Sequence, residues 1–505
     1  MKADSGPRAA DTSRFPDPVY AETVLKPLFD GAKTYFVDGF RRIDRAHLLM
    51  LTETGILPRA DAAAIGKALA AIDHEVDVAR LEYDGTVEDF FFMVEGELKR
   101  RLGPDLAGRL HTGRSRNDID HTLFKLRLKA DIDALAAKLR ALISALLNMA
   151  TRESRTIIVA YTHGQPAQPT TWGHYLVAMI EVLLHDAERL AAARRIADLS
   201  PMGSAAITTT GFPLDRARMA TLLGFAAPTA NSYGSIAAAD YITATYGALE
   251  LLFLHLGRPI QDLQFWTSFE VGQIYVPNAF VQISSIMPQK RNPVPIEHLR
   301  HLASQAFGRA RAMLDIVHNT PFTDMNDSEG ETQAFGFGAF ATGHRVLDLL
   351  ASLLPALSVD PARVAENLRR SCATVTELAD STVRIEGLSF RQAHEIAAHV
   401  ARTVVAAEGG LAEDGYAPFR EAFARTAGRP TGIDQKQFAE IVSPEYFIAV
   451  RDRPGGPAPA ALATAIAGCR AALAKLTDAA DADAAREQAA AAELGREFQS
   501  LTGGA

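Results

Sequence analysis

The sequence predicts an all-α protein built around a central bundle of long helices, and two observations support this prediction. From Asn117 to Met149, apolar residues recur alternately four and three positions apart. That spacing makes one continuous seam on a long helix, which packs against its neighbours at a shallow angle. In addition, no run of alternating polar and apolar residues indicates a sheet larger than a small hairpin.

The elements follow one another along 505 residues. After a leader interrupted by prolines, residues 20–110 read as short helices. The seam helix comes next, and at 1.5 Å per residue it should be about 45 Å long. Further long helical patterns lie near 170–198, 236–266, 293–318 and 335–355. Polar loops separate these patterns, so we expect the chemistry of the protein to lie in loops at the helix ends.

We expect three domains: an N-terminal helical domain over residues 1–116, the central bundle over 117–356, and a small C-terminal helical domain with an Ala-rich tail over 357–505. The tail, DAADADAAREQAAAAELGREFQ, favours a helix but has little to bury. Long bundles with wide apolar seams often bury them against copies of themselves, so we also expect a homo-oligomer.

Composition and charge exclude several classes of protein. The net charge of −8 gives no reason to expect binding to nucleic acid or to an anionic membrane. No apolar run approaches the length of a membrane span, and the longer ones carry charges or histidines. The N-terminal sequence lacks the apolar core of a signal peptide. The two cysteines, Cys372 and Cys469, show no metal-ligand spacing. We therefore expect a cytoplasmic protein without structural disulfides.

Two short motifs resemble cofactor sites but lack the required context. In HEIAAH, the second histidine, His399, comes one residue too late for the zinc motif HExxH, so its ring does not share a helix face with His394. In GFGAFATG, the GxG spacing follows no strand, so a dinucleotide site is not indicated. We expect neither a metal nor a cofactor.

Three polar loops are the candidate functional segments. HTGRSRND (His111–Asp118) precedes the seam helix, where small, hydroxyl and basic residues at a helix N-terminus can bind an anion. YTHGQPAQPTT (Tyr161–Thr171) places a threonine and a histidine ahead of two prolines that stiffen the turn. SSIMPQKRNP (Ser284–Pro293) is too polar for a core strand, and its two prolines prevent one unbroken helix.

Together, and in this order on long helices, the three loops resemble the signature regions of the aspartase/fumarase superfamily. They are most similar to those of the argininosuccinate lyases. The similarity extends to SPMGSAA (Ser200–Ala206) and GLSFRQAHE (Gly387–Glu395), so it covers most of the chain from about residue 40 to 400. It implies the three-domain helical fold of that superfamily and a homotetramer whose active sites combine loops from different subunits.

The resemblance also implies the reaction. Enzymes of this family remove a proton beside one carboxylate of a succinyl group and then expel an amine or hydroxyl, leaving fumarate. In this sequence Ser284 matches the base, and His163 fits the acid that protonates the leaving nitrogen. Lys290 and Asn292 would stabilise the charge of the carbanion. The positions that match dicarboxylate contacts are Ser115, Arg116, Asn117 and Thr162, with Ser285 and Gln289 assisting.

The sequence departs from the family pattern where the amine half of the substrate is bound. Asp44 replaces a serine, and Phe91 replaces a histidine. Asp324, Glu329 and Thr332 stand where the family has tyrosine, glutamine and lysine. This subsite therefore gains carboxylates and loses an ammonium, and we expect argininosuccinate not to bind in the usual pose.

Three alternatives remain open from the sequence. An enzyme of the ethylenediamine-disuccinate lyase type would act on another aminocarboxylate. A crystallin-like structural protein would not need His163 or the serine loop, and both are present. Adenylosuccinate cleavage would need a nucleotide-phosphate subsite, and none is evident.

Overall fold

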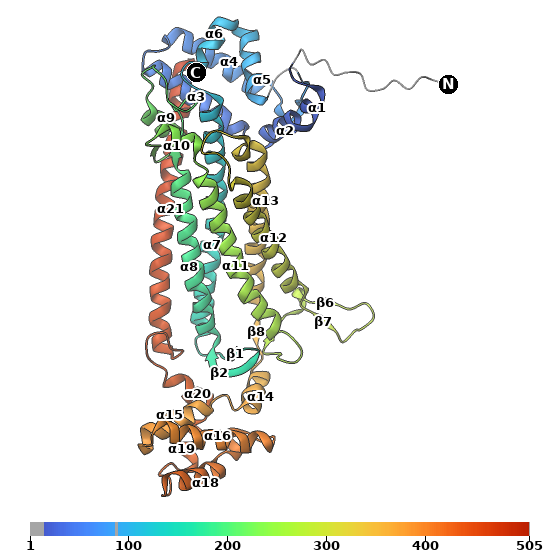
Figure 1. The fold of residues 1–505 in the computed structure, drawn as a ribbon, viewed down its shortest axis with the longest axis vertical. Coiled ribbons are helices and arrows are strands. Elements are labelled where there is room, and N and C mark those ends of the chain that lie inside the picture. Colours follow the sequence, from blue (N-terminus) through green and yellow to red (C-terminus); the bar gives the residue numbers. More distant parts are fainter. Residues whose placement is uncertain (1–14, 86–88, 504–505) are drawn as a thin grey trace, which may run out of the picture.

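The computed structural model describes residues 15–85 and 89–503 of the chain. Figure 1 shows an elongated molecule in which long helices run side by side, with a group of short helices at each end. The predicted all-α class is confirmed. Five long helices and a sixth from the C-terminal tail form the central bundle: α7 (Arg116–Arg152), α8 (Trp172–Ala197), α11 (Asp240–Trp266), α12 (Val294–Val317), α13 (Gly330–Leu353) and α21 (Pro459–Thr502).

The predicted seam is the buried face of α7. The residues of the seam, at four-and-three spacing from His121 to Met149, are all buried; they include Leu128, Leu135 and Leu142. At 1.5 Å per residue, α7 is about 55 Å long. This length separates the HTGRSRND loop, at its N-terminus, from the hairpin that follows its C-terminus.

The N-terminal helices cover one end of the bundle (Figure 1). They are α1 (Pro18–Tyr20), the π-helical turn η1 (Ala21–Leu25), α2 (Lys26–Tyr35), α3 (Val37–Glu53), α4 (Arg59–Glu75), α5 (Phe90–Leu102), α6 (Pro104–Gly108) and the 3-10 turns η2 (Val78–Arg80) and η3 (Arg109–His111). Short elements later in the chain lie in the loops between long helices: α9 (Arg216–Leu223), α10 (Ser232–Ala237), η4 (Asn278–Phe280), η5 (Asn326–Ser328) and η6 (Leu354–Ala356). Buried aromatic and aliphatic side chains of the N-terminal helices belong to the same hydrophobic cluster as the bundle.

The strands in the described part of the chain are short. The antiparallel hairpin of β1 (Ile157–Thr162) and β2 (Gln165–Thr171) is the largest sheet there. The others are two-residue pairs: β3 (Leu199–Ser200) with β4 (Ala227–Pro228), β5 (Ile274–Tyr275) with β8 (Ser358–Val359), and β6 (Gln282–Ile283) with β7 (Arg291–Asn292).

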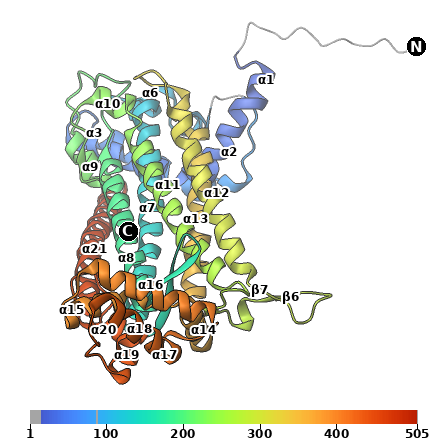
Figure 2. The ribbon, with the colours of Figure 1, turned by 60° about the horizontal axis from the view of Figure 1, so that its bottom comes forward.

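A second hydrophobic cluster lies at the other end of the bundle, among helices that Figure 2 brings to the front. They are α14 (Pro361–Ser371), α15 (Val375–Glu386), α16 (Phe390–Ala406), α17 (Leu411–Asp414), α18 (Tyr416–Ala427), α19 (Gln435–Ile441) and α20 (Pro444–Ala449). Phe419, Phe423 and Phe438 fill the centre of this cluster. The division of the chain at residues 117 and 357 stays a prediction.

The C-terminal tail differs from the expectation that it has little to bury. Its helix, α21, returns along the bundle and packs against α7 and α8. Leu494, Phe498 and Leu501 recur four and three positions apart and are buried. Ala490, four positions before Leu494, is also buried, so small and large side chains together pack this end of the helix.

Ion pairs add to this contact between α21 and the bundle. The ammonium of Lys129, whose side chain is 2% exposed, lies 2.5 Å from Asp198 Oδ1 and 2.8 Å from Glu487 Oε1 of α21. Arg194 donates to the same glutamate oxygen at 2.6 Å. Buried charges need partners of this kind, so the network fixes how α7, α8 and α21 face one another.

Two helices within the described ranges, α7 and α21, are long and apolar enough by composition to cross a membrane. The expectation that no segment approaches such a length is therefore wrong for these two. Both lie in the bundle, and the Lys129–Glu487 ion pair joins them directly. The seam of α7 packs on other helices of the chain, as expected for a core helix.

Candidate active site

Within one chain, the HTGRSRND loop lies far from the other two candidate loops. The HTGRSRND loop precedes α7, and the β1–β2 turn follows the far end of the same helix, about 55 Å away along its axis. The third loop joins β6 to β7 and projects from the side of the bundle (Figure 1). A site that uses all three loops must therefore take them from more than one chain.

Buried hydrogen bonds to Asp118 hold the HTGRSRND loop in place. Ser115 caps α7 in a capping box with Asp118, which accepts the Ser115 N–H at 2.9 Å. Asp118 also accepts the backbone N–H groups of Gly203 and Ala205, at 3.0 and 2.9 Å. Burial raises the pKa of Asp118 to about 7, and these three N–H groups oppose the shift. The loop is thereby tied to the SPMGSAA segment.

A buried histidine supports the same loop from α3. His47 Nε2 lies 2.9 Å from the carbonyl oxygen of Thr112. Burial, and then the charge of Arg114, lower the pKa of His47 to about 3, so the ring is neutral at physiological pH and donates this hydrogen bond. His47 was not predicted from the sequence; a lone histidine on an apolar helix face was the available signal.

Arg116 and Asn117 lie beside the predicted amine subsite. Asn117 Nδ2 donates to Asp324 Oδ2 at 2.8 Å and to the carbonyl oxygen of Ala206 at 3.2 Å. The guanidinium of Arg116 lies 2.8 Å from Asp89 Oδ2 and 4.0 Å from Asp120 Oδ2. The structure thus brings these two residues close to Asp324 and the neighbouring carboxylates, and their contact with substrate stays a prediction.

Carboxylates are concentrated around Arg116. Burial raises the pKa of Asp120 well above its usual value; the Arg116 charge opposes this, while Glu329, Asp89 and Asp324 raise it further. Such mutual repulsion is relieved when a cation binds. Asp324 and Glu329 were predicted from the sequence, whereas Asp89 and Asp120 were not. The signal that could have indicated Asp120 is a pair of polar residues, Asp120 and His121, at the start of an apolar seam.

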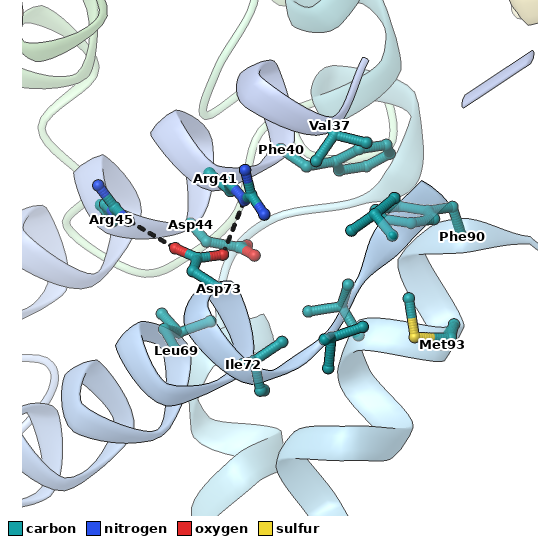
Figure 3. A pocket seen from close by; sticks show the side chains of 13 residues that line it. Val37, Phe40, Arg41, Asp44, Arg45, Leu69, Ile72, Asp73, Phe90 and Met93 are labelled. Carbon is teal, nitrogen blue, oxygen red and sulfur yellow. Dashed lines mark hydrogen bonds and ion pairs between the residues drawn. The ribbon is translucent and has the colours of Figure 1, made fainter. Parts of the chain in front are cut away.

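Asp44 has a partner within its own chain. Its Oδ1 accepts a hydrogen bond from Arg114 Nη1 at 2.6 Å, and only 8% of the residue is exposed. Figure 3 shows the adjoining cavity, where Arg41 and Arg45 both bond Asp73. This cavity holds only about 30 Å³, room for a water molecule but not for a substrate. The amine half of a substrate therefore cannot reach Asp44 through this cavity. A substrate contact by Asp44 stays a prediction.

The β1–β2 turn presents Thr162 and His163 at the end of the hairpin. The strands are joined by His163 and Gly164, both with positive φ (54° and 73°). Two positive φ values characterise the type I′ turn, which matches the twist of a two-residue hairpin. His163 tolerates this conformation at some cost, and its exposed ring is available to a second molecule.

The arm between β6 and β7, residues 282–292, carries the remaining predicted residues. Ser284 Oγ accepts the backbone N–H of Met287 at 3.2 Å, and Lys290 N–H bonds the Met287 carbonyl at 3.0 Å. Arg291 fastens the base of the arm by donating to the Val276 carbonyl at 2.7 Å. The side chains of Ser285, Gln289 and Lys290 are exposed, and Asn292 is half-buried on β7.

Apolar side chains on the arm are open to solvent. Ile283 is 70% exposed and Ile286 is 83% exposed. Two large aliphatic side chains on one projecting segment favour contact with another protein surface. The arm thus carries both the predicted base and an apolar surface for docking.

Comparison with known proteins identifies the family. A lyase family model matches residues 46–308, and an argininosuccinate lyase C-terminal model matches residues 372–449. Argininosuccinate lyase 2 of Agrobacterium fabrum is 68% identical over 501 residues, 99% of each chain. Argininosuccinate lyase of Halorhodospira halophila is 37% identical over 82% of this chain and 87% of its own.

Solved structures agree with this assignment. An EDDS lyase variant with bound fumarate has a TM-score of 0.82 and 27% identity, over 95% of both chains. EDDS lyase in complex with formate has a TM-score of 0.83 at the same identity and coverage. The chain therefore belongs to the argininosuccinate lyase family of the aspartase/fumarase superfamily and is a carbon–nitrogen lyase.

Proposed function

We propose that the enzyme catalyses the reversible β-elimination of an amine from an N-substituted aspartate, releasing fumarate. The observation that carries this proposal is the presence of all three signature loops, with His163 and Lys290 exposed and Ser284 half-buried on the projecting arm. The fumarate bound to the EDDS lyase variant, a protein of the same fold, supports a dicarboxylate product.

In this mechanism Ser284 removes the proton beside one succinyl carboxylate. A serine hydroxyl holds its proton tightly, so its oxygen needs donors when it is deprotonated. The Met287 N–H already points at Ser284 Oγ from 3.2 Å. The electron pair of the broken C–H bond moves into the carboxylate, where Lys290 and Asn292 stabilise the added charge.

The second half of the reaction breaks the C–N bond. The stored electron pair forms the carbon–carbon double bond, and the C–N pair leaves with the nitrogen. His163 donates a proton to that nitrogen, so the amine departs neutral. Only side chains take part, and the reaction needs no metal or cofactor. The dicarboxylate would be held by Ser115, Arg116, Asn117, Thr162, Ser285 and Gln289.

We propose a homotetramer in which each site combines loops of different subunits. The separation of the loops along α7 supports this, since about 55 Å lies between Ser115 and the hairpin. The exposed Ile283 and Ile286 of the arm support it too, because docking on another subunit would cover them. Cys372 and Cys469 are both free and buried, which supports a cytoplasmic location, and the similarity to argininosuccinate lyases supports a role in amino-acid metabolism.

The amine half of the substrate is proposed to carry a positive charge. Asp89, Asp120, Asp324 and Glu329 lie close enough to influence one another's charge, with Arg116 among them. An added carboxylate in this region would be repelled. A second candidate, an activity of the EDDS lyase type on other aminocarboxylates, is favoured by the TM-scores of 0.82 and 0.83.

An assay of purified enzyme with a panel of N-substituted aspartates tests the proposal. Fumarate formation is followed by its ultraviolet absorbance, and Ser284→Ala serves as the control. We expect fumarate from at least one adduct with the wild-type enzyme and only trace rates with the variant. If no adduct yields fumarate, the crystallin-like alternative gains support and the proposed reaction is wrong.

A further inference from the structure

A buried histidine on α7 faces the predicted amine subsite. His121 is 1% exposed, and its Nε2 has no hydrogen-bond partner among the described residues. That nitrogen lies 3.7 Å from Asp324 Oδ1, which likewise lacks a hydrogen-bond partner in the described part of the chain. Burying two polar atoms without a hydrogen bond reduces the stability of the fold, so the arrangement of this pair needs a physical reason.

Hydrogen bonds behind the ring fix its tautomer. Gln333 Nε2 donates to the Ser328 carbonyl at 2.9 Å and to the Tyr241 hydroxyl at 3.4 Å. Tyr241 already accepts one bond, so its own proton is free to go to His121 Nδ1, 3.1 Å away. Tyr241 keeps that proton because burial raises its pKa well above the usual value. A neutral His121 then carries its proton on Nε2, aimed at Asp324.

Asp324 is approached from both sides. Asn117 donates to Oδ2 at 2.8 Å, while the His121 N–H points at Oδ1. The gap to His121 is about 0.8 Å longer than a usual N–H···O hydrogen bond. A small movement of the Asp324 side chain, which is 29% exposed, closes this gap. Both oxygens are then oriented, and their remaining lone pairs face the subsite.

We infer that His121 is a positioning residue that holds Asp324 in place to receive the cationic group of the leaving amine. The inference rests on the proposed function, because Asp324 must face the amine half of the substrate. His121 does not touch substrate; it acts through the orientation of one carboxylate. An apolar residue at position 121 would let that carboxylate rotate away, and the enzyme would lose its preference for a cation while retaining the elimination chemistry.

The test compares two adducts that differ in one group, N-(2-aminoethyl)aspartate and N-(2-hydroxyethyl)aspartate. The ratio of their kcat/KM values measures the preference for an ammonium over a hydroxyl. We expect His121→Leu to lower this ratio about tenfold, the value of one well-made hydrogen bond to a charged group, chiefly by raising KM for the ammonium adduct. His121→Gln retains a side-chain N–H and should recover part of the ratio.

Two buried tyrosines of α11 provide a matched pair of further variants. Tyr241→Phe removes the hydroxyl that fixes the tautomer of His121 and should lower the ratio in the same direction by a smaller factor. Tyr246 is also buried, but its hydroxyl has no hydrogen-bond partner among the described residues. Tyr246→Phe should therefore leave the ratio at its wild-type value. Because Tyr241→Phe removes a single oxygen, it tests the inference even if position 121 tolerates no substitution.

The outcomes separate the two proposals. A wild-type ratio in both His121→Leu and Tyr241→Phe overturns the positioning role while the elimination reaction stands. Equal loss of activity on both adducts also overturns it, since that result indicates general damage to the site. Absence of fumarate from every adduct with the wild-type enzyme would overturn the proposed function itself.

Discussion

Asn117 Nδ2 lies 2.8 Å from Asp324 Oδ2, a hydrogen bond between residues 207 positions apart in the chain. It joins the first turn of α7 to the loop before α13. The HTGRSRND loop, which matches dicarboxylate contacts, is thereby held against the acidic residues of the predicted amine subsite. In the proposed site, this end of the bundle would contact both halves of the substrate, and the predicted base and acid, Ser284 and His163, would come from other loops.

Mixing two inactive variants tests whether sites are shared between subunits. Ser284→Ala and His163→Asn lie on different loops, so some sites of a mixed oligomer would contain neither substitution. We expect partial recovery of fumarate production when the two proteins are unfolded and refolded together. Each variant treated alone is the control. No recovery, despite subunit exchange detected with a tagged chain, would contradict shared sites.

The roles of the base and the acid can be separated by the leaving group. Ser284→Ala should lower kcat by several powers of ten without abolishing fumarate binding. His163→Asn should cost less when the amine is already a good leaving group, because protonation then matters less. Steady-state kinetics on adducts of amines with graded basicity measures this. Equal losses across the series would contradict the acid role.

His47 predicts a loss of stability in acid. Its pKa is about 3 in the folded chain, against an ordinary value of 6.5. Below pH 6.5 the unfolded chain binds a proton at His47 that the folded chain does not bind. The contribution of His47 to the free energy of unfolding is therefore fully present above this pH and is lost as pH falls toward 3. His47→Gln has no titrating ring but retains an N–H for Thr112. Its free energy of unfolding should fall less steeply with acid, by up to about 1.4 kcal/mol per pH unit, and its melting temperature should fall less steeply in turn.

The measurement compares the melting temperatures of wild type and His47→Gln from neutral pH down to about pH 5, within the window given by linkage. His163→Gln is the control, because that ring is exposed in the chain and makes no buried contact. Parallel curves for wild type and His47→Gln would show that His47 does not govern acid stability.

The buried contacts of Lys129 should make a large contribution to the free energy of unfolding, because they join α7 to the tail helix α21. Its buried ammonium contacts Asp198 and Glu487 and donates to the Gly224 carbonyl at 2.9 Å. Lys129→Met leaves buried carboxylates with one cation fewer and should cost about 3 kcal/mol. Lys138, on the same helix, forms an exposed pair with Asp348, and Lys138→Met should cost less than about 1 kcal/mol. Thermal unfolding of both variants checks the difference; equal shifts would contradict it.

Local patterns were sufficient to predict most of the fold. The four-and-three spacing from His121 to Met149 is a property of one helix, and it predicted the buried face of α7 correctly. The docking of α21 was not predicted, because it depends on ion pairs between residues far apart in the chain. Lys129 and Glu487, for instance, are separated by more than 350 positions, and neither shows in its local sequence that it meets the other.

The candidate residues of the site also come from local patterns, and their roles stay predictions. Signature motifs identify Ser284, His163 and Asn117 because each lies in a distinctive short segment. The contacts that hold the site residues in place come from other elements: the backbone N–H groups of Gly203 and Ala205 bond Asp118, and His121 lies behind Asp324. Their roles follow from three-dimensional contacts between polar groups, which no local spacing encodes.

The acidic subsite predicts the choice of substrate. Arginine, the leaving half of argininosuccinate, carries a carboxylate that Asp324 and Glu329 would repel. Each mismatched buried charge costs on the order of 1–3 kcal/mol, or about one to two powers of ten in kcat/KM. We therefore expect argininosuccinate to be a poor substrate compared with an adduct whose amine half carries only positive charge, such as N-(2-aminoethyl)aspartate.

Replacement of the acid should reverse this preference. Asp324→Asn preserves the shape of the side chain and removes its charge, so kcat/KM for argininosuccinate should rise relative to the diamine adduct by about tenfold. Asp348→Asn, an exposed carboxylate on the outside of α13, is the control and should change neither value. If argininosuccinate has the highest kcat/KM of all adducts, and Asp324→Asn lowers it, the guanidinium of the substrate is the cation that these acids receive.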